Sequence, residues 1–175
     1  MSSGVTGVTS EIDPHHLPHP TLAFLKAYWL HRRGTRPMPA RADINPSDMK
    51  EHLGWVLLLD VLPGAEDFRF RTVGTRVTEY FLQDATGKTV KEAFAPYGED
   101  TIKAVLATHR KVAREGVVLR VHGGAGLFGR AFLDFDAIYL PLSEDGATVN
   151  MILSGFTFDR SALLTARARK AGRPT

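Results

Sequence analysis

His109 is the residue of this sequence with the widest choice of chemistry. It shares helical spacing with Ile102 and Leu106, so a helix over residues 99–115 would carry it on an apolar face. A neutral imidazole there could ligate a haem iron, or it could line a core or pocket and make one hydrogen bond. We interpret His109 as a pocket-wall residue and keep haem ligation as the alternative.

Three arginines form a second candidate site. Arg69, Arg71 and Arg76 could bind an anion, because a guanidinium group pairs with a carboxylate or phosphate through two hydrogen bonds. Alternation along residues 68–73 turns Arg69 and Arg71 towards solvent or towards acids on a neighbouring strand. Arg76 begins the next helical pattern, so we expect it at the mouth of a pocket.

Two other pairs of charged residues have simpler structural explanations. Asp134 and Asp136 are of the residue type that acid–base chemistry uses, but they alternate with apolar residues as the solvent side of a strand does. Arg41 and Asp43 lie in a loop bounded by prolines. We interpret them as a clamp that fastens this loop, between an N-terminal helix and the core.

Composition and motifs exclude several kinds of site. The chain has no cysteine, which excludes disulfides, cysteine nucleophiles, zinc–thiolate and iron–sulfur centres, and chromophores linked through cysteine. No serine nucleophile elbow, phosphate loop or zinc-protease motif is present. The glycine-rich stretch at residues 123–126 precedes a strand and not a helix, unlike a phosphate-binding loop. We therefore expect that the protein is not an enzyme.

Length and charge place the chain among single-domain proteins. Its 175 residues are 43% hydrophobic and 23% charged, which suits one folded domain. The net charge of +3 is not gathered into a basic block, so we expect no nucleic-acid partner. The longest apolar stretch, residues 55–59, is too short to cross a membrane, and residues 1–20 hold no signal-like segment. We expect a cytoplasmic location and no membrane partner.

The first half of the chain predicts helices followed by a hairpin. Apolar spacing predicts an amphipathic helix over residues 21–33, ended by Gly34, and a short helix over residues 47–53. The apolar run 55–62 predicts a strand buried on both faces. Residues 68–73 alternate and complete an antiparallel hairpin with that run.

The second half predicts helices and then three strands. Short helical patterns cover residues 77–81 and 90–94, and a longer one covers residues 99–115 before Gly116. Three strands and a last helix follow, at residues 117–122, 131–140, 148–158 and 161–170. Sequential antiparallel strands with helices gathered in the middle are typical of an α+β fold.

This order of elements, with several local motifs, resembles the PAS domains, and in particular a family of stand-alone PAS proteins of alphaproteobacteria. The motifs that carry the resemblance are residues 28–34, 39–46, 68–75, 86–94 and 139–149, together with the acidic cap at residues 158–161. The resemblance implies a five-stranded antiparallel sheet with central helices on one face, a small internal cavity and an added N-terminal helix. It divides the chain into a loose N-terminus at 1–16, a PAS domain at 17–160 and a C-terminal helix and tail at 161–175.

The resemblance also implies a sensor or adaptor in signal transduction, often a homodimer, working with a small-molecule ligand or an unidentified signalling protein. We expect the cavity wall to hold Tyr80, Phe81, Phe94, Leu106 and His109, with Arg76 at its mouth. The aromatic residues of the N-terminal helix are the expected homodimer contact, namely Phe24, Tyr28 and Trp29.

Three alternatives stay open from the sequence. The family binds haem, flavin, small acids or nothing, so the cofactor is unknown, and His109 is the residue that a haem would use. A dimerisation module without any ligand is the second alternative. The third is an isomerase-like α+β enzyme with a buried carboxylate in a deep pocket.

Overall fold

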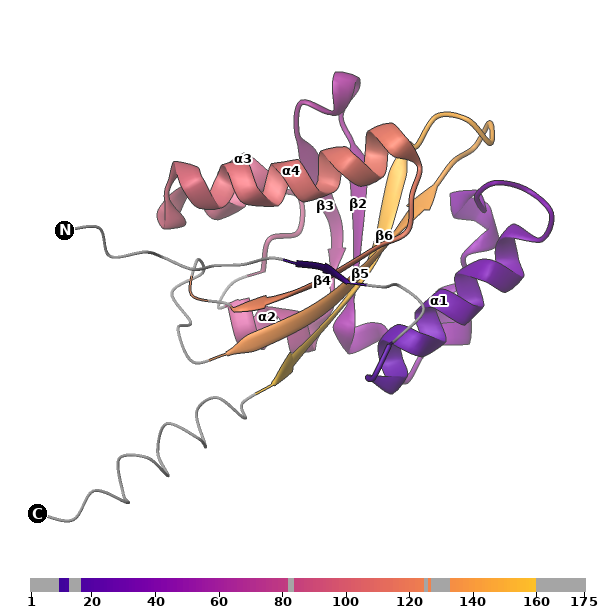
Figure 1. The fold of residues 1–175 in the computed structure, drawn as a ribbon, viewed down its shortest axis with the longest axis horizontal. Coiled ribbons are helices and arrows are strands. Elements are labelled where there is room, and N and C mark those ends of the chain that lie inside the picture. The colour runs from indigo at the N-terminus through magenta and orange to yellow at the C-terminus, as the bar shows by residue number, and fades with distance from the viewer. Residues whose placement is uncertain (1–9, 13–16, 82–83, 125, 127–132, 160–175) are drawn as a thin grey trace, which may run out of the picture.

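The computed structural model describes residues 10–12, 17–81, 84–124, 126 and 133–159. At its centre is a six-stranded antiparallel sheet with the strand order β1–β4–β5–β6–β2–β3. Figure 1 shows α4 lying across this twisted sheet. The helix α1 lies well apart from α4. Among the described helices, none is long and apolar enough to span a membrane.

Five of the six strands are those that the sequence predicts. Two form the hairpin and three follow the central helices: β2 (Val56–Val61), β3 (Phe68–Val73), β4 (Leu119–Gly124), β5 (Asp134–Leu142) and β6 (Met151–Asp159). The last strand, β6, lies at the middle of the sheet between β5 and β2. The predicted α+β fold, an antiparallel sheet with central helices and an added N-terminal helix, is confirmed.

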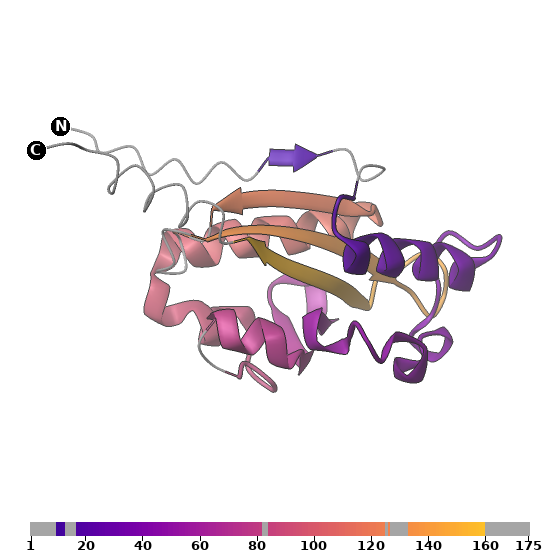
Figure 2. The same cartoon turned by 90° about the horizontal axis from the view of Figure 1, so that it is seen from below.

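The sixth strand is an addition to that prediction. β1 (Ser10–Ile12) pairs with the edge strand β4, with Glu11 opposite Val121, inside the segment predicted to be a loose terminus. Figure 2 shows β1 running beside β4. An edge strand has unpaired N–H and C=O groups that another segment can bind. The pairing depends on that edge and not on any periodicity in residues 10–12, so the local sequence could not show it.

The first helix, α1 (Pro20–Arg33), begins and ends at recognisable signals. His19 precedes it, and its Nδ1 accepts a hydrogen bond from the backbone N–H of Thr21 at 3.2 Å. Gly34 follows it with φ of +56°. A Cβ atom on Gly155 of β6 would lie 2.4 Å from Leu25 Cδ1, so α1 packs directly on the backbone of β6.

The segment after α1 differs from the predicted helix over residues 47–53. It forms three short 3₁₀ helices, η1 (Arg41–Asp43), η2 (Pro46–Met49) and η3 (Leu53–Trp55). Its backbone hydrogen bonds span three residues, as from His52 N to Met49 O at 2.8 Å. The prediction of one helix was wrong, because the chain must turn sharply here to bring Gly54 against Gly74.

The central helices agree with the predicted pattern. They are α2 (Thr75–Phe81), α3 (Val90–Phe94) and α4 (Glu99–Glu115), with the 3₁₀ turn η5 (Ala95–Tyr97) between α3 and α4. Another 3₁₀ turn, η4 (Pro63–Ala65), lies between β2 and β3. Thr89 and Glu92 form a capping box at the start of α3. Gly116, with φ of +63°, ends α4 and donates its N–H to Val112 O.

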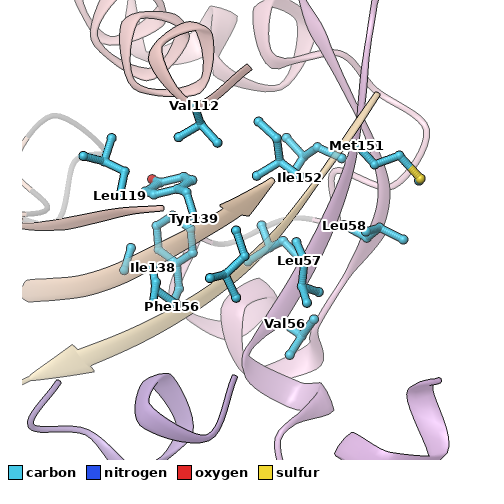
Figure 3. Close-up of a cluster of buried hydrophobic side chains, with 14 of the residues drawn as sticks. Val56, Leu57, Leu58, Val112, Leu119, Ile138, Tyr139, Met151, Ile152 and Phe156 are labelled. Atoms are coloured by element: carbon cyan, nitrogen blue, oxygen red, sulfur yellow. The ribbon is translucent and has the colours of Figure 1, made fainter. Parts of the chain in front are cut away.

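The sheet has two covered faces. We call the face that packs on α3 and α4 the inner face, and the face that packs on α1 the outer face. Figure 3 shows the core between α4 and the sheet, where Val112 points towards Tyr139 and Ile152. Alternate residues of β5 and β6 belong to opposite faces, because side chains of a strand point to the two sides in turn.

The predicted last helix, residues 161–170, and the whole C-terminal segment 161–175 lie outside the described residues. The same is true of most of the loop between β4 and β5.

Candidate functional site

His109 lies between two aromatic rings of the inner face. Its ring centroid is 5.1 Å from that of Phe68 on β3 and 5.1 Å from that of Tyr139 on β5. Its Nδ1 lies 2.8 Å from Val105 O, one turn earlier in α4. Because a carbonyl oxygen only accepts, Nδ1 carries the proton and donates it, which leaves a lone pair on Nε2.

Burial decides the charge of this group. Loss of solvent around His109 lowers its pKa to about 4, although the hydrogen bond to Val105 and the charge of Asp67 oppose the shift. The imidazole is therefore neutral near neutral pH. Burial likewise raises the pKa of the Tyr139 hydroxyl, which keeps its proton.

Ser154 contributes a buried hydroxyl without a partner. It lies opposite Tyr139 in β5 and opposite Leu57 in β2, so these three side chains share the inner face. Ser154 is 0% exposed, and its Oγ has no hydrogen-bond partner among the described residues. A buried polar group in this state costs about 1–3 kcal/mol, so most such groups in proteins are paired.

Together, His109, Tyr139 and Ser154 place neutral polar groups in an apolar core. They can donate and accept hydrogen bonds, and none of them carries a charge near neutral pH. Such a cluster suits recognition of an uncharged polar group better than recognition of an ion.

The sheet order and the helices between β3 and β4 agree with one family of known proteins. A PAS-domain family model matches residues 17–156, which is most of the chain. This chain is a PAS domain. PAS domains are sensory and signalling modules, so the family sets the general role of the protein. No curated protein matches it.

Three residues of the expected cavity wall lie along the inner face of this PAS domain. Leu106 and His109 are both buried on α4, one turn apart. Phe94 of α3 packs on Phe70, with ring centroids 6.4 Å apart, and Phe70 is two residues along β3 from the Phe68 that contacts His109.

The remaining predicted ligand residues differ in their positions. Tyr80 stacks on Phe158 at 4.3 Å and lies 6.1 Å from the ring of Trp55. Phe158 connects this group of rings through Phe156 to Tyr139, so Tyr80 belongs to the same aromatic network as His109. Arg76 is exposed and pairs with Glu79 at 3.6 Å. Phe81 is the last residue of α2, and its side chain lies outside the described part of the chain.

The sequence analysis missed Tyr139, Ser154 and Phe68 as members of this cluster. One signal was available. Ser154 interrupts the otherwise apolar start of β6, and a hydroxyl in a strand buried on both faces needs a partner. Which residue would face it depended on the register between β5 and β6, which a single sequence does not contain.

The packing around His109 does not fit a haem. An axial ligand needs an open side on which the porphyrin can lie, but Phe68 and Tyr139 pack on this ring and leave it 4% exposed. We therefore assign no role in haem ligation to His109.

The predicted dimer residues of this PAS domain are used largely within the chain. Trp29 is 3% exposed and donates its Nε1–H to Pro141 O at 2.8 Å, so it is a core residue and not a surface contact. Tyr28 donates to Asp48 Oδ2 at 3.0 Å, and its ring stacks on Phe24. Both Phe24 and Tyr28 keep part of their surface exposed.

For the charged residues on the strands, one prediction is confirmed and one is wrong. Arg71 pairs with Asp60 on the neighbouring strand at 3.1 Å, as expected. Asp136 does not alternate into water. It pairs with the buried Arg120 of β4, whose Nε lies 2.9 Å from Asp136 Oδ1, because the outer face is covered at this point.

Proposed function

We propose that this PAS domain is a sensory or adaptor module that holds a small, uncharged, polar ligand on its inner face. The unpartnered Ser154 hydroxyl is the observation that supports the proposal. A ligand that hydrogen-bonds to Ser154 and to the lone pair of His109 would satisfy groups that folding alone leaves without partners.

The signal would leave the site through α4. A ligand between α4 and the sheet shifts the position of α4 only by binding one arrangement more tightly than another. Arg110, next to His109, donates to Ala65 O at 3.0 Å and to Glu66 O at 2.9 Å, in the turn between β2 and β3. A displacement of α4 would therefore reach that turn.

The signal is passed on through a protein contact made by the outer helices. The partner is a second copy of the chain in a homodimer or a separate signalling protein. Ala23, Ala27 and Leu30 are exposed at four- and three-residue spacing along α1, beside the partly exposed Phe24. This apolar stripe supports α1 as the contact. The cytoplasmic location stays a prediction from the sequence.

Thermal denaturation in the presence of a metabolite library tests the ligand proposal. We expect at least one neutral polar compound to raise the melting temperature, because a ligand that binds only the folded state stabilises it. The Ser154→Ala variant should melt higher than the wild type without ligand and should lose the shift. Ser47→Ala removes the same hydroxyl from an exposed position and should change neither quantity.

Two outcomes would reject the ligand site. One is a Ser154→Ala variant that keeps the full shift. The other is the absence of any stabilising compound together with an unchanged melting temperature in Ser154→Ala. The second outcome, with a dimer present in solution, would favour the dimerisation module without a ligand.

A further inference from the structure

A pocket lies on the outer face of the sheet, so it is separate from the inner-face site. Its volume is about 330 Å³, within the range of small-molecule sites in proteins. Val56 and Leu58 of β2 and Leu153 of β6 form its floor, and Ile44 and Met49 of the 3₁₀ segment cover it. In Figure 1, the purple segment that follows α1 lies next to that helix and away from α4.

Close packing of two glycines fixes one end of this outer pocket. Gly74 donates its N–H to Val56 O at 2.8 Å, and a Cβ atom on Gly74 would lie 2.4 Å from Gly54 O. The two backbones therefore meet with no side chain between them. Both glycines line the pocket, so its shape is set by backbone contacts and exists before any ligand binds.

The outer pocket has few polar side chains, and one of them is charged. Arg41 is its charged lining residue, and it donates from Nη1 to Ile44 O at 2.8 Å. No carboxylate of the described residues lies within ion-pair distance of this guanidinium group, while Glu144 binds the backbone N–H of Arg41 at 3.2 Å. Thr72 and Thr75 add exposed hydroxyl groups at the mouth.

The mouth of the pocket also exposes apolar surface. Leu53 lines it and is 37% exposed, which makes it one of two large apolar side chains with that much exposure among the described residues. A site with apolar walls and floor and a single cation matches a molecule with a hydrocarbon tail and one negative charge.

We propose that the outer pocket binds a medium-chain carboxylate. The hydrocarbon tail lies along Leu58, Met49 and Leu153, and the carboxylate pairs with the Arg41 guanidinium group. Arginine suits this role because its planar fork can donate two parallel hydrogen bonds to a carboxylate. This site is independent of the ligand proposed for the inner face.

Titration of the ¹⁵N-labelled protein with octanoate, followed by amide NMR shifts, tests the proposal. Saturable shifts are expected at Gly54 and at residues 72–75, and not along α4. The same titration with 1-octanol should give shifts at the same amides with about tenfold weaker binding, because the alcohol keeps the tail and loses the charge-assisted hydrogen bonds.

Three variants separate the tail from the charge. Arg41→Gln should weaken octanoate binding about tenfold and leave octanol binding unchanged. Arg114→Gln removes the same charge from an exposed position on α4 and should leave both unchanged. Thr72→Phe, on an exposed strand position, should fill the pocket and abolish binding of both compounds while the fold is kept.

Several results would overturn the proposal. Equal binding of octanoate and octanol would remove the role of Arg41. An equal loss of octanoate affinity in Arg41→Gln and Arg114→Gln would mean that Arg41 contributes only a general attraction between charges. Shifts along α4 in place of residues 72–75 would move the ligand to the inner face, and an unaffected titration in Thr72→Phe would exclude the pocket. The Ser154→Ala variant should bind octanoate and octanol as the wild type does. Either proposal can therefore be rejected without affecting the other.

Discussion

The protonation state of His109 is set by its surroundings in the folded chain. Its Nδ1 proton is held by Val105 O, and burial between Phe68 and Tyr139 keeps the ring neutral. The pKa of His109 in the folded chain, about 4, lies below its ordinary value of 6.5. The folded state therefore resists a proton that the unfolded chain accepts.

This difference predicts a pH-dependent loss of stability. Because the folded pKa is the lower one, the stability is complete above pH 6.5 and falls as the pH falls towards 4. The free energy of unfolding should drop by about 3 kcal/mol over this window from His109 alone. Urea denaturation of His109→Leu at the same pH values should show a smaller slope than the wild type.

The exposed His31 of α1 provides the matched control. His31→Leu should keep the pH slope of the wild type. If His109→Leu keeps it as well, the buried imidazole is not the group that destabilises the folded chain in acid.

Trp29 supports a second prediction about a single side chain. Trp29→Phe removes the hydrogen bond to Pro141 O and leaves that carbonyl group without its partner, so the free energy of unfolding should fall by about 2 kcal/mol. Tyr28→Phe also removes one polar group, but from a more exposed position, and should cost about 1 kcal/mol or less. Chemical denaturation gives both values, and an equal loss in the two variants would contradict the core position of Trp29.

The sequence predicts the burial of such side chains only where neighbouring residues in the chain form the pattern. The apolar neighbours of His109 one turn away in the helix were sufficient to predict its burial. Trp29 was predicted at a dimer contact because its partner, Pro141, is far along the chain. Asp136 was placed in water for the same reason, since nothing near it in the sequence shows that Arg120 is buried beside it.

Among the elements, α4 and the turn between β2 and β3 are joined by one side chain. Arg110 donates from Nε and Nη2 to the carbonyl groups of Ala65 and Glu66. Ala65 has φ of +53°, which is unfavourable for a residue with a side chain, and the bond to its carbonyl oxygen helps to hold it there. The pair of bonds makes α4 and the hairpin one mechanical unit.

Removal of this contact is predicted to loosen the hairpin turn. Arg110→Ala should lower the free energy of unfolding by about 1–3 kcal/mol, because two charge-assisted hydrogen bonds are lost. Amide hydrogen exchange should increase at residues 65–68. Arg114→Ala, one turn later on α4 and exposed, should change neither measurement. Equal exchange at the turn in both variants would exclude the coupling between α4 and the hairpin.

A helix could be predicted where the residues at its ends mark where it begins and stops. The end of α4 was predicted correctly because Gly116 follows its last residue. The 3₁₀ segment was predicted as one helix, since its Asn45 and Pro46 are also helix-start residues. What shortens it is the contact of Gly54 with Gly74, from a different part of the chain.

In the whole molecule, β1 and the 3₁₀ segment are what the local pattern could not show. Both are placed by contacts with distant parts of the chain, β1 by pairing with β4 and the 3₁₀ segment by the approach of Gly54 to Gly74. The neutral polar cluster of the inner face lies under α4, while the outer pocket lies under the 3₁₀ segment.

The added helix supports a last prediction, about assembly. Ala27 is exposed at the centre of the apolar stripe of α1, so a homodimer formed through that helix should not tolerate a charge there. Ala27→Arg should convert the dimer to a monomer with little change in stability, because arginine is a good helix former in water. Ala107→Arg places the same side chain on an exposed position of α4 and should leave the dimer intact.

Sedimentation velocity over a range of protein concentrations distinguishes the two variants. A dimer that survives Ala27→Arg and dissociates in Ala107→Arg would move the contact from α1 to α4. A wild-type chain that stays monomeric at every concentration would leave the α1 stripe to a separate signalling protein. A monomer in Ala27→Arg together with a dimer in Ala107→Arg would place the dimer contact on α1, because only the first variant puts a charge on the exposed apolar stripe of that helix.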